Sequence, residues 1–268
     1  MVRPGWAPED IDVNRPSVAR VYDYYLGGSH NFAVDRAMAE KAMAEWPELP
    51  VLMAANRGFL RRAVRFCIDS GVRQFLDLGS GIPTVGNVHE VAQSASAQAR
   101  VVYVDVDPIA VAHSRAILAG NEQATAIQAD LRNPAAVLRD PLVRGMLDLS
   151  QPVAVLLVAV LHFVSDDDDP AGIVSALRSA LVPGSLVVIS HASQDGVDER
   201  AEGHRALYAR AASPMTMRNR EQIAHLLDGL ELVPPGVSPI RLWRPEPGDE
   251  TDGDPASFAG YAAVGRVA

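Results

Sequence analysis

The sequence predicts an α/β fold built on a mostly parallel sheet. Three short apolar runs each end in an aspartate, at Asp77, Asp105 and Asp130, and two glycines follow the first of them. A fourth run, residues 152–164, is apolar on both faces, as expected for a central strand that is covered on both sides. Open α/β sheets bind ligands at the carboxyl ends of their strands. The three acids therefore form one candidate site, provided that their strands are neighbours.

Composition and charge narrow the class of protein. The chain has 268 residues, of which 48% are hydrophobic, and this fits one α/β domain with an added segment. A net charge of −9 disfavours a nucleic-acid partner. The single cysteine, Cys67, excludes an internal disulfide, argues for a reducing compartment and lies in an apolar setting typical of a core. We see no secretory signal, and the longest apolar run is too short to span a membrane, so we expect a cytoplasmic protein without a membrane partner.

The N-terminal region is expected to be helical after a loose tail. Helices are predicted over residues 16–26, 35–46 and 51–70. In the first of them, Val18, Val21, Tyr22 and Tyr25 share one face. This face could be core packing alone, or it could form a lid over a pocket in which Tyr22 offers an aromatic surface to a cationic ligand.

Two residues of this region are candidates for ligand contact. Arg57 lies near the expected mouth of the pocket, where its guanidinium could pair with a ligand carboxylate, and a plain surface arginine is the alternative. His30 belongs to a polar loop and is a weak candidate for substrate contact. Arg61, Arg62 and Arg65 are expected to form a solvated face of the third helix.

The glycine loop follows the first strand, which we expect over residues 74–78. Gly79 and Gly81 lack a Cβ, so the backbone can turn sharply and a ligand can lie against the peptide planes. A dinucleotide-binding loop requires a third glycine where Thr84 stands, and Asp77 would repel a pyrophosphate. An ammonium or sulfonium fits better, and S-adenosylmethionine (SAM) carries both. A bare strand-to-loop turn and an NAD-dependent oxidoreductase remain the alternatives.

A second acid stands at the end of the strand expected over residues 100–106. Asp105 lies 24 positions after Gly81 (105 − 81). An acid about 20 residues beyond a glycine loop can accept both ribose hydroxyls, because its two oxygens accept in parallel. Asp107 precedes Pro108 and is interpreted as a helix N-cap rather than as a ligand contact.

A third acid, Asp130, closes the short strand expected over residues 124–131. Its carboxylate could accept the amine of an adenine, with the backbone N–H of Leu131 nearby. The alternative is an ordinary turn aspartate, because Arg132-Asn133-Pro134 turns the chain.

The C-terminal half offers weaker candidates. His162 lies near the end of the fourth strand and is interpreted as a base, a substrate contact or a satisfied buried histidine, and His191 is another weak candidate for substrate contact. The run Asp166–Asp169 is interpreted as the start of a helix rather than as a metal site. The last two strands are expected to form an antiparallel hairpin at the sheet edge. The other expected elements are helices over 85–94, 109–119, 171–181, 198–211 and 219–227, and strands over 185–190, 230–233, 240–244 and 258–267.

Three motifs resemble those of class I SAM-dependent methyltransferases: Leu-Asp-Leu-Gly-Ser-Gly at 76–81, Val-Asp-Val-Asp-Pro at 104–108 and Ala-Asp-Leu at 129–131. Segments 15–28, 30–36 and 158–164 resemble a bacterial family known as "S-adenosyl methyltransferase". The resemblance implies a Rossmann-like, seven-stranded, mostly parallel sheet with one antiparallel strand and helices on both faces. It also implies an N-terminal helical lid, residues 1–50, and a SAM-binding domain, residues 51–268. Pro83 departs from the wider superfamily, in which a third glycine is frequent at that position.

The resemblance also implies SAM as cofactor and S-adenosylhomocysteine (SAH) as product. It assigns the methionine part to Asp77, Gly79, Ser80 and Gly81, the ribose to Asp105, the adenine to Val106, Asp130 and Leu131, and a close approach to Ala159, with Tyr22 and Arg57 completing the site. We expect transfer of the methyl group to a small-molecule acceptor, and assign no catalytic residue. The alternative is a module that binds SAM or SAH without turnover.

Overall fold

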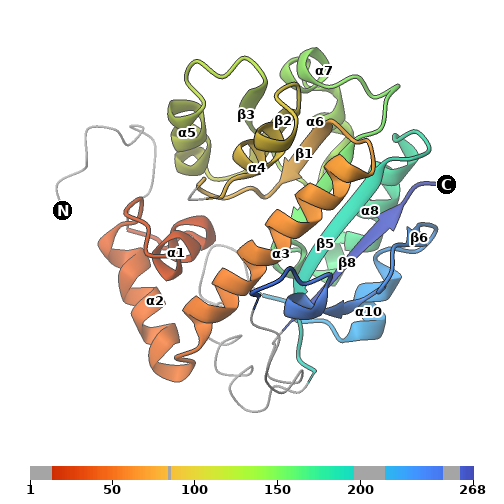
Figure 1. Cartoon of the computed structure of the whole chain (residues 1–268). Helices are drawn as coiled ribbons and strands as arrows, with labels where there is room; N and C mark the ends of the chain where they lie inside the picture. The colour runs from red at the N-terminus through yellow and green to blue at the C-terminus, as the bar shows by residue number, and fades with distance from the viewer. Residues whose placement is uncertain (1–13, 84–85, 196–214, 250–259) are drawn as a thin grey trace.

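A twisted sheet runs through the middle of the molecule (Figure 1). The computed structural model describes residues 14–83, 86–195, 215–249 and 260–268, and in that part eight strands share one sheet. The strand order is β3-β2-β1-β4-β5-β8-β6, with β7 paired to β8. The strands are β1 Gln74–Leu78, β2 Arg100–Asp105, β3 Ala124–Gln128, β4 Ala154–Val158, β5 Leu186–Ala192, β6 Glu231–Leu232, β7 Ser238–Pro239 and β8 Gly260–Arg266.

Strand direction agrees with the expected fold. β1 to β5 pair in parallel, and β8 runs antiparallel to β5, β6 and β7. The mostly parallel α/β sheet with one antiparallel strand is therefore confirmed, with the two-residue β7 as an eighth member. The expected edge hairpin is corrected, because β8 lies between β5 and β6 and is not at the edge.

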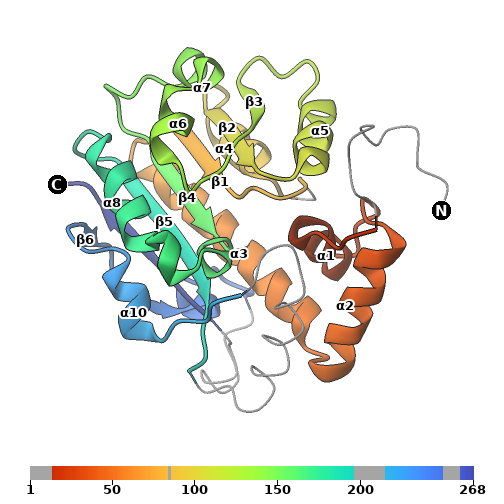
Figure 2. The ribbon, with the colours of Figure 1, turned by 180° about the vertical axis from the view of Figure 1, so that it is seen from behind.

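Helices cover both faces of the sheet (Figures 1 and 2). Side chains of the strands alternate between two cores, with Phe75 facing α3 and α4, and Leu76 facing α6, α7 and α8. Within the described ranges, no helix is both long and apolar enough to cross a membrane. The helices are α1 Val18–Tyr25, α2 Ala33–Glu45, α3 Leu49–Asp69, α4 Val88–Ala95, α5 Pro108–Ile117, α6 Pro134–Arg139, α7 Pro141–Met146, α8 Pro170–Ser179 and α10 Arg220–His225, with short 3-10 helices η1 Leu161–Phe163, η2 Asp166–Asp168 and η3 Ile240–Leu242.

Most expected helices are present, and two short ones come in addition. α6 and α7 each begin with a proline directly after a capping residue, Asn133 or Asp140. They are too short to show a clear apolar period, so the caps are their only local signal. The start of α8 is confirmed, since Asp169 accepts a hydrogen bond from the Gly172 N–H at 2.9 Å. The helix expected over 198–211 lies outside the described residues.

The central strand is shorter than predicted. β4 ends at Val158, and Ala159 adopts a left-handed conformation with φ of 55° before η1. Leu161 and Val164 are nevertheless buried in the same core as β4. The apolar run therefore continues past the strand, and hydrophobicity alone cannot show where the extended backbone stops. His162 consequently lies in a 3-10 helix beyond the strand end.

A C-terminal segment covers one face of α3 and explains two further corrections. The segment 240–244 contains no strand: Ile240–Leu242 form η3, and the next two residues form a bend. Arg62 is buried rather than solvated, because it donates to the carbonyl oxygens of Trp243 at 2.9 Å and Ile240 at 2.8 Å and pairs with Asp249. Arg61 and Arg65 are exposed as expected, and Cys67 is fully buried. The burial of Arg62 could not be predicted from the local pattern of the helix, because its partners lie about 180 residues away in the chain.

The N-terminal helices α1 and α2 lie beside the sheet, next to the first turns of α3 (Figures 1 and 2). Val21 and Tyr25 of α1 are buried there in a small apolar cluster of their own. Arg20 anchors this unit: its Nε lies 2.8 Å from the Asp35 carboxylate, and its guanidinium also lies 3.3 Å from Asp107, directly after β2. The helical segment is thus tied to the carboxyl end of the sheet.

Candidate functional site

One cavity of about 390 Å³ opens at the carboxyl ends of β3, β2, β1 and β4, four strands that are adjacent in the sheet. This volume lies within the range of about 300–1,000 Å³ that is usual for small-molecule sites. The three strand-end acids share the cavity, as expected for acids on neighbouring strands. It brings together all eleven residues predicted to contact the cofactor: Tyr22, Arg57, Asp77, Gly79, Ser80, Gly81, Asp105, Val106, Asp130, Leu131 and Ala159.

Asp77 lies near the end of the central strand β1, between Tyr103 of β2 and Leu156 of β4. It is only 6% exposed. Burial raises the pKa of its carboxyl to about 7; the positive charge of Arg57 opposes this rise, and the negative charge of Asp105 adds to it. The carboxylate therefore stands in a setting that favours the arrival of a cation.

The glycine loop is fixed to the neighbouring strand by its backbone. The amides of Gly79 and Ser80 donate to the Val104 carbonyl oxygen at 2.8 and 3.1 Å. Gly79 has a φ of 69°, and a Cβ on it would lie 2.1 Å from a methyl group of Val160. Gly81 has a φ of 65°, and its amide donates to the Asp105 carboxylate at 2.7 Å. Only glycine meets both demands at position 79.

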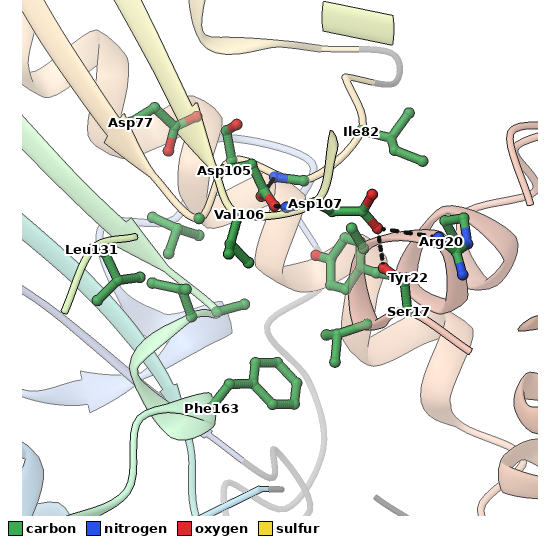
Figure 3. A pocket seen from close by; sticks show the side chains of 18 of the residues that line it. Ser17, Arg20, Tyr22, Asp77, Ile82, Asp105, Val106, Asp107, Leu131 and Phe163 are labelled. Atoms are coloured by element: carbon green, nitrogen blue, oxygen red, sulfur yellow. Dashed lines mark hydrogen bonds and ion pairs between the residues drawn. The ribbon is translucent and has the colours of Figure 1, made fainter. Parts of the chain in front are cut away.

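Asp105 ends β2 and faces the same space as Asp77 (Figure 3). One of its oxygens accepts the Gly81 amide, and the other accepts the Asp107 amide at 2.8 Å. Burial raises the pKa of Asp105 to about 6, and these amide hydrogen bonds oppose the rise. Each oxygen keeps a second lone pair, so a pair of ligand hydroxyls can still be accepted. Beside it, Val106 exposes 61% of its surface and forms an apolar wall.

Asp130 and Leu131 line the cavity from the loop after β3. Both oxygens of Asp130 accept from Arg132, which holds the pKa of this carboxyl below its usual range. The Arg132 amide also donates to Asp130 at 2.9 Å, as in a turn. Asp130 is thus a turn aspartate whose loop nevertheless forms one wall of the cavity.

Tyr22 and Arg57 reach the cavity from the helical side. The Arg57 guanidinium carbon lies 5.9 Å from the centre of the Tyr22 ring. The Tyr22 hydroxyl accepts from the Asn56 amide at 2.9 Å and donates to the Met53 carbonyl oxygen at 3.4 Å. Burial raises the pKa of Tyr22, while Arg57 lowers it, so the phenol is neutral at physiological pH.

The candidate histidines His30, His162 and His191 lie outside this cavity. The His30 ring packs against His113, with ring centroids 4.1 Å apart. His162 and His191 both line a second, smaller cavity. Burial lowers the pKa of His191 to about 4, and its neutral ring accepts from Arg218 and donates to the Ala192 carbonyl oxygen. His191 is thus held in structural hydrogen bonds.

Five described residues of the N-terminal helical segment line the cavity although no local pattern in the sequence predicts them there: Arg15, Pro16, Ser17, Ala19 and Arg20. Of these, Ser17 and Arg20 bind the carboxylate of Asp107 (Figure 3). Asp107 also caps α5 by accepting from the Ile109 amide at 2.8 Å, as predicted. Its second task could not be foreseen, because its partners lie about 90 positions earlier in the chain.

The carboxyl groups that line this cavity fit a ligand with a positive charge and neighbouring hydroxyl groups. Two buried carboxyls have raised pKa values, and positive charge would favour their ionised forms. Exposed Val106 and partly buried Leu131 offer apolar surface to a flat ring. SAM has these features: a sulfonium, an ammonium, a ribose and an adenine. The described lining residues therefore fit this cofactor.

Comparisons with known proteins identify the family. A sequence profile described as S-adenosyl methyltransferase matches residues 4–268. The structure of a DUF574-family protein from Streptomyces avermitilis is similar at 38% identity, covers 96% of this chain and 99% of that chain, and has a TM-score of 0.92. A protein from Thermobifida fusca named as a candidate methyltransferase has 41% identity, coverage of 98% and 99%, and a TM-score of 0.91. A comparison with curated proteins returned no significant match. The chain therefore belongs to the S-adenosyl methyltransferase family, and S-adenosylmethionine is its cofactor.

Proposed function

We propose that this protein transfers the methyl group of SAM to a small-molecule acceptor. One observation carries the proposal: the two buried carboxylates, Asp77 and Asp105, and the glycine loop converge on one cavity at the ends of adjacent strands. Residues 15–20 and Tyr22, in and just before α1, complete the cavity wall. We propose that they belong to a lid segment, residues 1–50, on a cofactor-binding domain, residues 51–268. Within that segment, Tyr22 is the residue that we expect to contact the cofactor.

The cofactor's amino-acid end would lie between Asp77 and Arg57. Asp77 would accept from its ammonium, and Arg57 would pair with its carboxylate, which matches the opposite charges of these two side chains. Gly79, Ser80 and Gly81 would present their peptide planes to the same end. Burial raises the pKa of Asp77 because it disfavours the ionised carboxylate. A positive charge of the ligand next to this carboxylate would stabilise the ionised form and so lower the pKa again.

The nucleoside end would lie along the ends of β2 and β3. Asp105 would accept both ribose hydroxyls on the lone pairs that the amides of Gly81 and Asp107 leave. Val106 and Leu131 would cover the two sides of the adenine, and the loop of Asp130 would meet its edge. Ala159, in its left-handed turn after β4, would then approach the middle of the cofactor.

SAM would supply a methyl group bonded to a positively charged sulfur: a nucleophilic acceptor atom would form a bond to the methyl carbon, the sulfur–methyl bond would break, and SAH would leave. The contribution of this chain is to fix the direction of approach and to exclude water. Tyr22 offers a neutral aromatic ring to the cationic centre. An amine or thiolate acceptor can arrive already deprotonated, so transfer needs no general base from the protein.

A second candidate is a module that binds SAM or SAH without turnover. It is favoured by the absence of histidine and cysteine from the described residues that line the main cavity. Incubating the full chain with methyl-labelled SAM and a library of small molecules separates the two functions. A transferase labels at least one compound, and does so less in the Asp105→Ala variant. A binding module retains SAM and labels none.

A further inference from the structure

A second cavity of about 80 Å³ adjoins the main one on the side of α1 and α3. The two cavities share five lining residues, which form the boundary between them: Val18, Tyr22, Asn56, Ala159 and Phe163. Figure 3 shows Tyr22 and Phe163 at the part of the main cavity away from Asp77. A ligand in the second cavity would therefore border the cofactor without displacing the groups that we assign to it.

The wall of the second cavity is aromatic and apolar. Trp46, Tyr25 and Phe163 contribute rings, and Met53, Met215 and Met217 contribute flexible thioethers. Among the described residues that line it, none is acidic, and Arg241 carries positive charge. An ammonium would find no counter-ion in this wall, and burying an unpaired charge is costly. The occupant of this cavity is therefore neutral or anionic rather than cationic.

A chain of hydrogen bonds crosses the boundary and holds its polar groups. The Ala159 amide donates to Ser190 Oγ at 2.9 Å, Ser190 Oγ donates to Asn56 Oδ1 at 2.6 Å, and the Asn56 amide donates to the Tyr22 hydroxyl. The Tyr22 proton has only a long contact of 3.4 Å to the Met53 carbonyl oxygen. The neutral Tyr22 hydroxyl is thus placed to donate a stronger hydrogen bond to a ligand atom at the boundary.

Resting on the proposed function, we propose that this second cavity is the acceptor subsite and that it takes a single-ring aromatic compound without positive charge. An apolar cavity on the order of 150 Å³ accepts benzene. At about 80 Å³, the second cavity is too small to enclose a whole ring in this structure, so the ring would extend across the boundary into the main cavity or displace the flexible methionine side chains, and a second ring would not fit. The ring would lie among Trp46, Phe163 and the methionines. Its polar substituent would point back to the Tyr22 hydroxyl, at the boundary with the cofactor cavity.

Phenol is the probe for this proposal, and benzylammonium is its charged counterpart. Ligand-observed NMR titrations would measure the Kd of each on the full chain saturated with SAH. We expect phenol to bind at least about tenfold more tightly than benzylammonium, because the wall offers no anion to the ammonium. Separately, calorimetry would measure the affinity of the chain for SAH.

Two adjacent alanines of α3 provide a matched pair of variants. Ala55 lines only the second cavity, and Ala54 is exposed and lines neither. Ala55→Phe should fill the subsite and weaken phenol binding at least about tenfold, with SAH affinity changed less than about twofold. Ala54→Phe adds the same ring outside the subsite and should leave both affinities unchanged.

Several outcomes would overturn the proposal. If the wild-type chain binds SAH but not phenol, or if Ala55→Phe binds phenol as well as Ala54→Phe does, the second cavity is not the acceptor subsite, while the proposed function stands. Equal or tighter binding of benzylammonium would overturn the exclusion of cationic ligands. If the wild-type chain fails to bind SAH, the proposed function fails first, and this inference fails with it.

Discussion

Replacing Asp77 with asparagine should stabilise the ligand-free protein at pH 8 while weakening its hold on SAM. Burial raises the folded-state pKa of this carboxyl from 3.8 to about 7. Such a group contributes stability that is fully present below pH 3.8 and is lost as the pH rises through about 7. At 1.36 kcal/mol per pH unit, (7 − 3.8) × 1.36 gives about 4 kcal/mol of lost stability at pH 8.

Asparagine keeps the shape of the side chain and removes this dependence on pH. Burying its amide costs roughly 1–3 kcal/mol, so the variant should be more stable than the wild type by about 2 kcal/mol at pH 8. Between pH 5 and pH 8 the wild type loses (7 − 5) × 1.36, or about 3 kcal/mol, that the variant keeps. By pH 5 the wild type has lost only (5 − 3.8) × 1.36, or about 1.6 kcal/mol, so the advantage of the variant should disappear and the two stabilities should lie within about 1.5 kcal/mol of each other.

Urea denaturation of both proteins at pH 5 and pH 8, without ligand, measures how the difference in their stability changes with pH. Asp167→Asn is the matched control, because Asp167 is exposed in η2. For the control, we expect the same difference from wild type at both pH values. A variant Asp77→Asn that is destabilised by the same amount at pH 5 and pH 8 would refute the account, because Asp77 would then be ionised without cost.

Two further predictions concern the loop and the protonation of the site. SAH affinity should fall as the pH drops from 7 to 5, by about tenfold per pH unit at first and more steeply below pH 6. The reason is that Asp77 and Asp105 take up protons with pKa values of about 7 and about 6. Calorimetry at several pH values measures the affinity, and a flat profile would contradict this prediction. Gly79→Ala should lose more stability in urea than Gly71→Ala, by at least about 1 kcal/mol, because both glycines have positive φ but only at position 79 would the new methyl group meet Val160. Equal losses would remove the steric argument.

Local patterns in the sequence predict the strands that build the site. The runs that end at Asp77 and Asp105 form β1 and β2 with almost the expected bounds, because a buried parallel strand is marked by continuous apolar residues. The neighbourhood of these strands follows from the pairing of β1 with β2 and of β2 with β3. The acids therefore predict a shared cavity only on condition that their strands are neighbours, and the strand pairing meets that condition.

Long-range contacts are the part that local patterns do not provide. Arg62 has the pattern of a surface residue, since its partners at Ile240 and Trp243 are far away in the chain. The apolar pattern of β4 continues through the turn at Ala159, and it therefore places His162 wrongly in a strand. For the second cavity, the sequence offers only His162 and the apolar face of α1, because the rest of the wall comes from side chains of α3, β5, residues 215 and 217, and η3, which are distant in the chain.

Calorimetric titration of SAH into the wild type and the Asp105→Ala variant tests the central claim most directly. Our account predicts one site per chain in the wild type and loss of binding by at least about a hundredfold in the variant, because two hydroxyls lose a charged acceptor at once. Unfolding in urea would show that the variant is folded. Wild-type affinity in Asp105→Ala would contradict the account, since the cofactor would then lie elsewhere than at the ends of β1 and β2.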